Sequence, residues 1–237
     1  NKLYKDRGKN RFFRRRSVKS TIDEIKYAMN HIPTVEFINF MDDHFLINDE
    51  WLDEFVDRYG KEIAKPFIIR GTPESVTEQR IRKLKEVGLQ TVQIGIQSGC
   101  AKTHKEIFHR VFNKEKIIEA ARILHKENVQ GMYDFIIGNE FETVEAKKAT
   151  IELMMELPKP YLANVFHIIP FPKTDIVKWY EEHNVVPKLD PYDTSYKEIE
   201  DDFFTMLATL VPTTDNEKIK AFLENMDTKE CQEEVYN

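Results

Sequence analysis

Hydrophobic and polar positions divide the chain into two kinds of segment that alternate. Short runs rich in β-branched and aromatic residues are typical of strands, and longer stretches with an apolar residue at every third or fourth position are typical of helices. Strands are predicted over residues 35–40, 66–70, 91–96, 130–137 and 162–168. Helices are predicted from 17–20 to about 30, from 48–49 onward, and over about 75–87, 102–108, 114–127, 143–157 and 175–183.

One helix followed by five strand–helix repeats predicts an α/β fold. A strand joined through a helix to the next strand requires parallel neighbours and right-handed crossovers. The apolar strands fit a parallel sheet covered by helices, and both an open doubly wound sheet and a (β/α) barrel satisfy this pattern. In either architecture ligands gather at the carboxyl ends of the strands, so candidate functional residues are expected there.

The strand–helix alternation stops near residue 187. Residues 190–237 hold 13 acidic and four basic residues, and amphipathic helices are predicted over 199–210 and 218–226. We therefore expect a first unit over residues 1–186 and an acidic helical extension over residues 187–237.

Composition places the chain among folded, water-soluble proteins. Hydrophobic residues make up 41% and charged residues 32% of the 237 positions, enough for one substantial core. No apolar run approaches the length of a membrane span. The two cysteines, Cys100 and Cys231, provide neither a disulfide framework nor metal-ligand spacing, so a reducing cytoplasm is the expected location. No Walker A loop, zinc signature or nucleophile elbow occurs.

Charge is distributed unevenly along the chain. Residues 1–20 carry nine Lys or Arg and one Asp, a net charge of +8, which leaves −14 on the remainder because the whole chain carries −6. A basic arm with interleaved aromatic residues suits nucleic acid, but an acidic body opposes that partner. We expect the arm to pack on the acidic body or to lie near an anionic ligand, and we do not expect nucleic acid as a partner.

The first predicted strand is followed by two adjacent carboxylates, Asp42 and Asp43. One of them could accept hydrogen bonds from an ammonium group of a ligand. An ordinary surface turn, in which Asp is common, fits the same pattern and is favoured by these two residues taken alone.

The third predicted strand ends with Gly95 and Gly99 on either side of Gln97 and Ser98. Glycines at a strand end let a ligand approach the backbone, and the two polar side chains offer donors and acceptors that suit a ribose or an amino-acid group. An ordinary turn fits equally well. Arg110 follows on a loop. Its guanidinium could hold a carboxylate through two hydrogen bonds, but a solvated surface arginine is the commoner case and fits the same position.

The fourth predicted strand ends at Gly138. Thr143 is expected to cap a helix whose N-terminus faces the strand ends, a position that favours anions. Of Tyr133 and Asp134 within the strand, one is expected to point into the barrel interior. A buried Asp134 needs hydrogen-bond partners and is either structural or a site residue.

In order and spacing these motifs resemble the radical S-adenosylmethionine (SAM) superfamily, most of all the branch whose members often carry an N-terminal cobalamin-binding domain. The segments that carry the resemblance are Arg14-Arg-Arg-Ser17, Asp42-Asp-His-Phe45, Gly95–Gly99, Asp134–Thr143 and Phe171-Pro-Lys-Thr174. The resemblance covers about residues 1–185. It implies a partial (β/α)6 TIM-like barrel that lacks its first strand and is followed by a helical appendage.

The resemblance also implies a SAM site at the strand ends. Met41, Asp42 and Asp43 occupy the place of the motif that binds the SAM amino group. Gln97 and Ser98 match the strand end that contacts the ribose and methionyl parts.

Residues on the next loop and strand complete the site that the resemblance implies. Arg110 matches the arginine that pairs with the methionyl carboxylate, and Ile136 to Gly138 correspond to the strand that lies along the adenine. In this family SAM chelates a [4Fe–4S] cluster and its cleavage yields a 5′-deoxyadenosyl radical. A small-molecule substrate and a reductant for the cluster are the implied partners, and no protein side chain is assigned a catalytic role.

The chain departs from the family in its metal ligands. No CxxxCxxC motif occurs, the strand before that motif and a cobalamin domain are absent, and Glu140 and Lys173 stand where the family often has Pro and Gly. The cluster needs three thiolates on one loop. We therefore expect a fragment that begins just after the cluster loop, comes from an enzyme of this family and is inactive on its own, with cobalamin bound only through an absent domain.

Three alternatives remain open from the sequence. The chain could be a catalytically degenerate barrel that binds SAM or a partner, or it could derive from a methylthiotransferase-like enzyme that modifies RNA. It could also be an unrelated (β/α) enzyme in which Asp42, Asp43 and Glu142 perform acid–base chemistry, in which case SAM would not bind.

Overall fold

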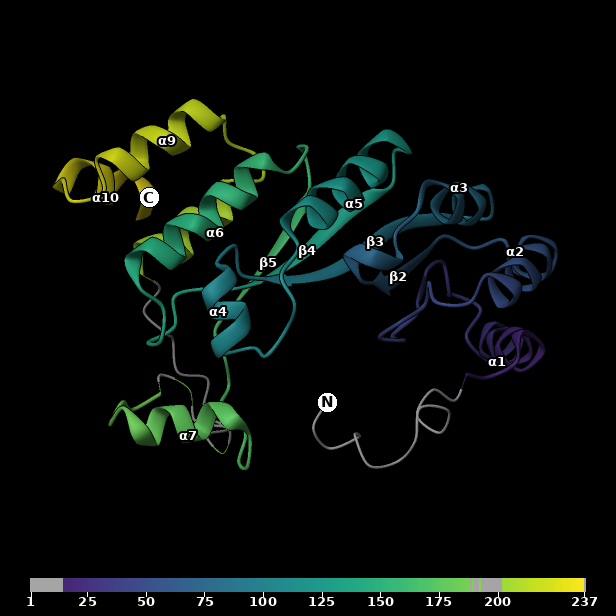
Figure 1. Ribbon diagram of the computed structural model, residues 1–237. Coiled ribbons are helices and arrows are strands. Elements are labelled where there is room, and N and C mark those ends of the chain that lie inside the picture. The colour runs from purple at the N-terminus through teal and green to yellow at the C-terminus, as the bar shows by residue number, and fades with distance from the viewer. Residues whose placement is uncertain (1–14, 188, 190–191, 193–201, 237) are drawn as a thin grey trace.

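The computed structural model describes residues 15–187, 189, 192 and 202–236. Five parallel strands form one sheet in the order β1-β2-β3-β4-β5, which curves into a half-barrel (Figure 1). The strands are β1 (Ile38–Asn39), β2 (Phe67–Gly71), β3 (Leu89–Gln97), β4 (Gln130–Ile136) and β5 (Leu162–Phe166). The predicted α/β partial barrel with parallel strands is confirmed.

Each strand is followed by at least one helix, as the sequence predicts. The helices of the barrel are α1 (Val18–His31), α2 (Asp49–Glu62), α3 (Glu78–Glu86), α4 (Ala101–Glu106), α5 (Lys114–Lys126), α6 (Val144–Glu156) and α7 (Asp175–Glu182). A 3-10 turn, η2 (Pro73–Ser75), precedes α3. In Figure 1 α5 and α6 lie along one side of the strands, whereas α7 lies beyond the other.

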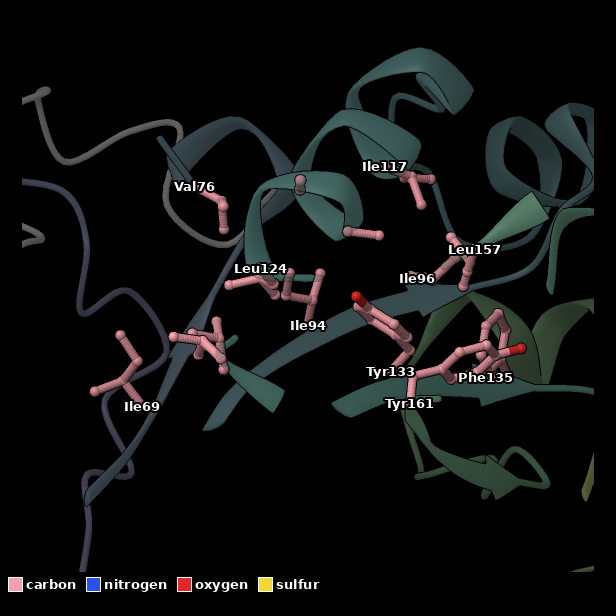
Figure 2. Close-up of a cluster of buried hydrophobic side chains, with 14 of the residues drawn as sticks. Ile69, Val76, Ile94, Ile96, Ile117, Leu124, Tyr133, Phe135, Leu157 and Tyr161 are labelled. Carbon is pink, nitrogen blue, oxygen red and sulfur yellow. The ribbon is translucent and has the colours of Figure 1, made fainter. Parts of the chain in front are cut away.

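The core lies between the strands and the helices that cover their outer face. Along β3 and β4 buried residues alternate with half-buried ones. Figure 2 shows Ile94 and Ile96 of β3, Tyr133 and Phe135 of β4 and Leu124 of α5 as members of one buried cluster. Burial of such side chains stabilises a fold by about 1.5–3 kcal/mol each, so this face anchors the sheet.

The opposite face of the strands, which we call the inner face, is more polar and only half-buried over most of its area. Residues in register on parallel strands point to the same side, and this assigns the inner face. Its members on β2 to β5 are Ile68, Arg70, Thr91, Gln93, Gly95, Gln130, Met132, Asp134, Ile136, Leu162, Asn164 and Phe166. Asp134 therefore points inward, as one of the two residues Tyr133 and Asp134 was expected to do.

Local capping explains where the helices begin. The side chains of Ser17, Asn48 and Thr143 accept hydrogen bonds from backbone N–H groups in the first turns of α1, α2 and α6. Thr174 occupies the cap position of α7, but its hydroxyl donates to the Phe171 carbonyl at 2.5 Å. The predicted helix over 75–87 begins later, because Thr77 caps α3 by accepting from the Arg80 N–H at 3.4 Å.

The first strand is shorter than predicted. Only Ile38 and Asn39 pair with β2, whereas the hydrophobic pattern suggested six residues over 35–40. In the sheet that the described residues form, this strand lies at the edge, and the apolar residue Phe37 beside it is 46% exposed.

Within the described part of the C-terminal region, three helices share the core of the barrel. They are α8 (Phe203–Leu210), α9 (Asn216–Glu224) and α10 (Lys229–Tyr236). α8 contacts β5 and α6, and its Phe203, Phe204 and Leu207 belong to the same buried cluster as the barrel strands. The helix predicted over 218–226 is found as α9. The start of the one predicted over 199–210 lies outside the described residues, and α10 was not predicted.

The basic arm falls largely outside the described residues, which begin at Arg15. Arg16 pairs with Glu24 of α1. None of the described helices is long and apolar enough to cross a membrane.

Candidate functional site

Gln97 and Arg110 meet at the carboxyl end of β3. The Gln97 side-chain carbonyl accepts a hydrogen bond from an Arg110 Nη atom at 2.6 Å. The register between β3 and β4 shifts at this point, and Gln97 has a φ of +68°, a left-handed conformation that non-glycine residues seldom adopt. Such bulges re-aim side chains and are frequent beside functional sites. The left-handed backbone at Gln97 therefore coincides with an exposed pair of polar groups at the strand end.

Gly95 provides the room that the Gln97 side chain needs. A Cβ atom at position 95 would collide with the Gln97 amide nitrogen, which shows that this amide folds back over the strand. Gly99 serves a different purpose, because a Cβ there would lie 2.7 Å from the Ala149 carbonyl carbon and from the Thr150 Cα of α6. Gly99 therefore permits close packing of α6 rather than ligand approach.

Ser98 is fully buried beneath this pair. Its hydroxyl lies 3.2 Å from the Thr150 hydroxyl and accepts from the Cys100 N–H at 3.1 Å, while the Gly99 N–H donates to Thr150 at 2.9 Å. The structure therefore brings Gln97 and Arg110 together and places the Ser98 hydroxyl in the contact between β3 and α6.

His104, which was not among the predicted site residues, supports the loop that carries Arg110. Its Nε2 lies 2.8 Å from the Ser98 carbonyl, and its own carbonyl accepts the Arg110 N–H at 2.9 Å. Burial, opposed by the Ser98 hydrogen bond and aided by the Arg110 charge, lowers the pKa of His104. The one signal in the sequence was its position four and eight residues before Phe108 and Phe112, whose rings stand 5.8 and 4.9 Å from the imidazole.

Met41, Asp42 and Asp43 lie in the loop after β1, on the far side of β2 from Gln97, and all three are exposed. Arg15 anchors this loop by donating to the His44 and Phe45 carbonyls at 2.6 and 2.8 Å. Burial lowers the pKa of Arg15, and the nearby charge of Asp42 opposes that shift.

At the end of β4, Ile136 and Gly138 have different surroundings. Ile136 is half-buried on the inner face. Gly138 has a φ of +78°, and a Cβ there would collide with the Thr205 hydroxyl and lie 2.9 Å from His167 Cε1. The C-terminal helix α8 therefore fills the space beside Gly138.

Glu142 is a buried carboxyl group close to this strand end, with 9% of its surface exposed. One oxygen accepts from the Asn139 N–H at 3.0 Å and from the Asn139 amide at 3.3 Å, and the other has no hydrogen-bond partner within the part of the chain that the structure describes. Burial raises the pKa of Glu142 from 4.5 to about 6, against the lowering effect of the Asn139 hydrogen bonds. Among the described residues, Glu142 forms no hydrogen bond with Asp42 or Asp43, so the structure does not assemble an acid–base set from them.

The raised pKa of Glu142 predicts a pH-dependent stability. The folded protein binds a proton that the unfolded chain has already released, so this contribution is fully present below pH 4.5 and is lost as pH rises through about 6. The loss amounts to about 2 kcal/mol by the standard conversion of a pKa difference. The unfolding free energy of the wild type is expected to fall by this amount between pH 4.5 and 7. In Glu142→Gln this part of the fall is expected to be absent.

Urea denaturation at both pH values measures the effect, with Glu152→Gln on the exposed face of α6 as the matched control. Equal pH dependence in the wild type and in Glu142→Gln would contradict the assignment.

The family of the chain follows from its sequence match. The sequence model of a family described as the radical SAM superfamily matches residues 4–154. The chain belongs to the radical SAM superfamily. Its members are typically enzymes that use SAM and a [4Fe–4S] cluster. No curated protein matches the chain.

Solved radical SAM structures share the fold. The cobalamin-dependent SAM radical enzyme OxsB, in its apo form, aligns with a TM-score of 0.62 and 14% identity over 96% of this chain and 43% of its own. The radical SAM methyltransferase TsrM from Kitasatospora setae aligns with a TM-score of 0.54 and 16% identity, over 64% of this chain and 29% of its own.

Coproporphyrinogen III oxidase (HemN) from Escherichia coli aligns with a TM-score of 0.53 and 16% identity over 70% of this chain and 41% of its own. At these identities the likeness shows the fold alone. The chain spans less than half the length of each of these three proteins.

The cysteines of the radical SAM chain do not fit a [4Fe–4S] cluster. Cys100 precedes α4, whereas Cys231 is buried in α10, where its sulfur donates to the Phe222 carbonyl at 3.4 Å. Within the described residues no three His, Cys, Asp or Glu side chains are grouped to hold a metal. The cluster ligands that the family requires are therefore not supplied by these side chains.

Proposed function

We propose that this chain forms the SAM-binding part of a radical SAM enzyme. The observation that carries the proposal is the Gln97–Arg110 pair, which a bulged strand end with left-handed backbone places at the carboxyl edge of the sheet. Ligands of parallel α/β folds bind at that edge. No carboxylate of the described residues forms an ion pair with Arg110, so its guanidinium retains donors for an anionic group.

The residues at the strand ends suit SAM in part. Arg110 would hold the methionyl carboxylate, and Gln97 would contact the ribose and methionyl parts through its amide. Met41 to Asp43 would bind the amino group. Ile136 would lie along the adenine. Ser98, which is buried beneath the Gln97–Arg110 pair, would hold the strand end in place. SAM supplies radical chemistry in this family when it binds together with the cluster; the protein's own side chains bind and orient it.

Activity on a substrate is proposed only for the parent protein. A small-molecule substrate, a reductant and a cobalamin domain would belong to that protein, and the chain alone is proposed to be inactive because cluster cysteines are missing. We retain residues 1–186 as the proposed barrel unit and residues 187–237 as its acidic extension.

Calorimetric titration of the 237-residue chain with SAM tests the proposal. Binding is expected, and Arg110→Gln is expected to weaken it roughly tenfold or more, since a hydrogen bond to a charged group contributes about 1.5–3 kcal/mol. Gln97→Ala is expected to weaken it as well, and the double variant to lose less than the sum because the two side chains contact each other.

The matched control is Arg122→Gln, which removes an exposed arginine from α5. Its affinity for SAM is expected to equal that of the wild type. Absence of heat with the wild type at millimolar SAM, or full affinity in Arg110→Gln, would refute the proposed site.

A further inference from the structure

Four polar side chains form a continuous row across the inner face. Arg70 of β2 donates from Nε to the Gln93 side-chain carbonyl at 3.2 Å. The Gln93 amide donates to both Asp134 oxygens at 3.0 and 2.8 Å, and the Asn164 amide donates to Asp134 at 2.8 Å. The row thus joins four neighbouring strands, and each hydrogen bond fixes the orientation of the next side chain.

The row keeps two opposite charges apart. The described residues include no ion pair between Arg70 and a carboxylate, and none between Asp134 and a cation. Instead, the neutral Gln93 amide stands between them, with its carbonyl toward the guanidinium and its nitrogen toward the carboxylate. Asp134 is satisfied by two amides, whereas the two terminal nitrogens of Arg70 have no partner among the described residues.

This arrangement prepares Arg70 for an anion. The Nε contact holds the plane of the guanidinium, and the four remaining N–H groups form the fork that matches a carboxylate or a phosphate. Because the group is half-buried, an anion bound there is screened less than at an exposed arginine.

Apolar side chains flank the polar row on both sides. Met132 and Leu162 are paired in register before it, and Ile136 and Phe166 are paired after it. Leu162 and Phe166 remain 47% and 48% exposed. A ligand that covers this area would bury hydrocarbon beside its charged group, which favours an organic anion over a free inorganic ion.

We propose that the inner face binds the substrate through a carboxylate or phosphate group held on the two terminal nitrogens of Arg70. The hydrocarbon part of the substrate lies over Met132, Leu162 and Phe166. This inference rests on the proposed function, since it assigns a substrate class to the same barrel, but it uses a group on β2 that the SAM residues do not include.

Side-chain NMR on the 237-residue chain tests the proposal with hexanoate and hexyl phosphate as probes and hexanol as the uncharged control. Saturable shifts of the Arg70 Nε–H and Gln93 amide signals are expected with at least one anion and not with hexanol. The stronger of the two anions identifies the substrate group.

Variants of Arg70 distinguish the contribution of the planar guanidinium from that of the positive charge. Arg70→Gln is expected to weaken anion binding roughly tenfold or more, and Arg70→Lys to weaken it less, whereas Arg122→Gln has no effect. Arg70→Lys also keeps the test valid if Arg70→Gln fails to fold. Equal shifts with hexanol, no shift with either anion, or full anion affinity in both Arg70 variants would overturn the inference.

The SAM titration distinguishes the two proposals. Arg70→Lys is expected to bind SAM with wild-type affinity. Loss of the anion response with retained SAM binding affects the inner-face inference alone, whereas an anion response without SAM binding refutes the proposed function and leaves Arg70 as an anion site.

Discussion

Replacing Phe55 with alanine is expected to lower the free energy of unfolding by about 3–5 kcal/mol, because the truncation removes buried hydrocarbon and leaves a cavity. Phe55 is fully buried in α2. Its ring centre lies between 4.9 and 6.0 Å from those of five aromatic neighbours: Phe40, Phe45, Trp51, Tyr59 and Phe67. Guanidinium denaturation followed by circular dichroism measures the loss.

The exposed Phe37 provides the control for this cluster. Phe37→Ala removes the same atoms from a side chain that is 46% exposed, and it is expected to cost about 1 kcal/mol or less. Because Phe40 and Phe45 flank the loop that carries Met41 to Asp43, Phe55→Ala is also expected to loosen that loop. Similar losses in the two variants would show that the aromatic cluster is not a tightly packed core.

Replacing Gly99 with alanine is expected to destabilise the protein by about 3 kcal/mol, the upper part of the range for overpacking. The added Cβ would press against the backbone of Ala149 and Thr150, and a helix backbone cannot turn aside as a side chain can. The displacement would also break the hydrogen bond from the Gly99 N–H to Thr150. The midpoint of urea denaturation measures the effect.

Gly95→Ala is the matched comparison on the same strand. Its Cβ would meet only the end of the flexible Gln97 side chain, so the unfolding free energy is expected to change by about 1 kcal/mol or less. The two variants therefore separate a packing glycine from one that makes room for a polar group. An equal loss of stability in both would contradict this distinction.

The order of the elements could be predicted from the sequence because its causes are local. Ser17, Asn48 and Thr143 cap helices through contacts within three residues, and alternation within β4 marks its two faces. The length of β1 could not be predicted, since hydrophobicity does not show that this strand lies at the edge of the sheet that the described residues form. The α10 helix lacks a hydrophobic pattern strong enough to stand out.

The candidate site was only partly predictable. Gln97 and Arg110 were singled out in the sequence, but their contact depends on a register shift and a left-handed backbone that no local pattern encodes. Ser98 stands in the same motif, but its hydroxyl is buried against the hydroxyl of Thr150, which lies 52 positions later in the sequence. The row from Arg70 to Asn164 requires the register of four strands and was not predicted.

Gly138 shows how the end of the chain shapes the barrel. Asp202 caps α8, pairs with Lys147 of α6 and lies with Thr205 in the space beside this glycine. A shortened protein without α8 would therefore not be the same barrel with a shorter tail. It would have a groove along the end of β4 and bare apolar surface where Phe203 and Phe204 now pack, so the last helices serve as a wall of the barrel.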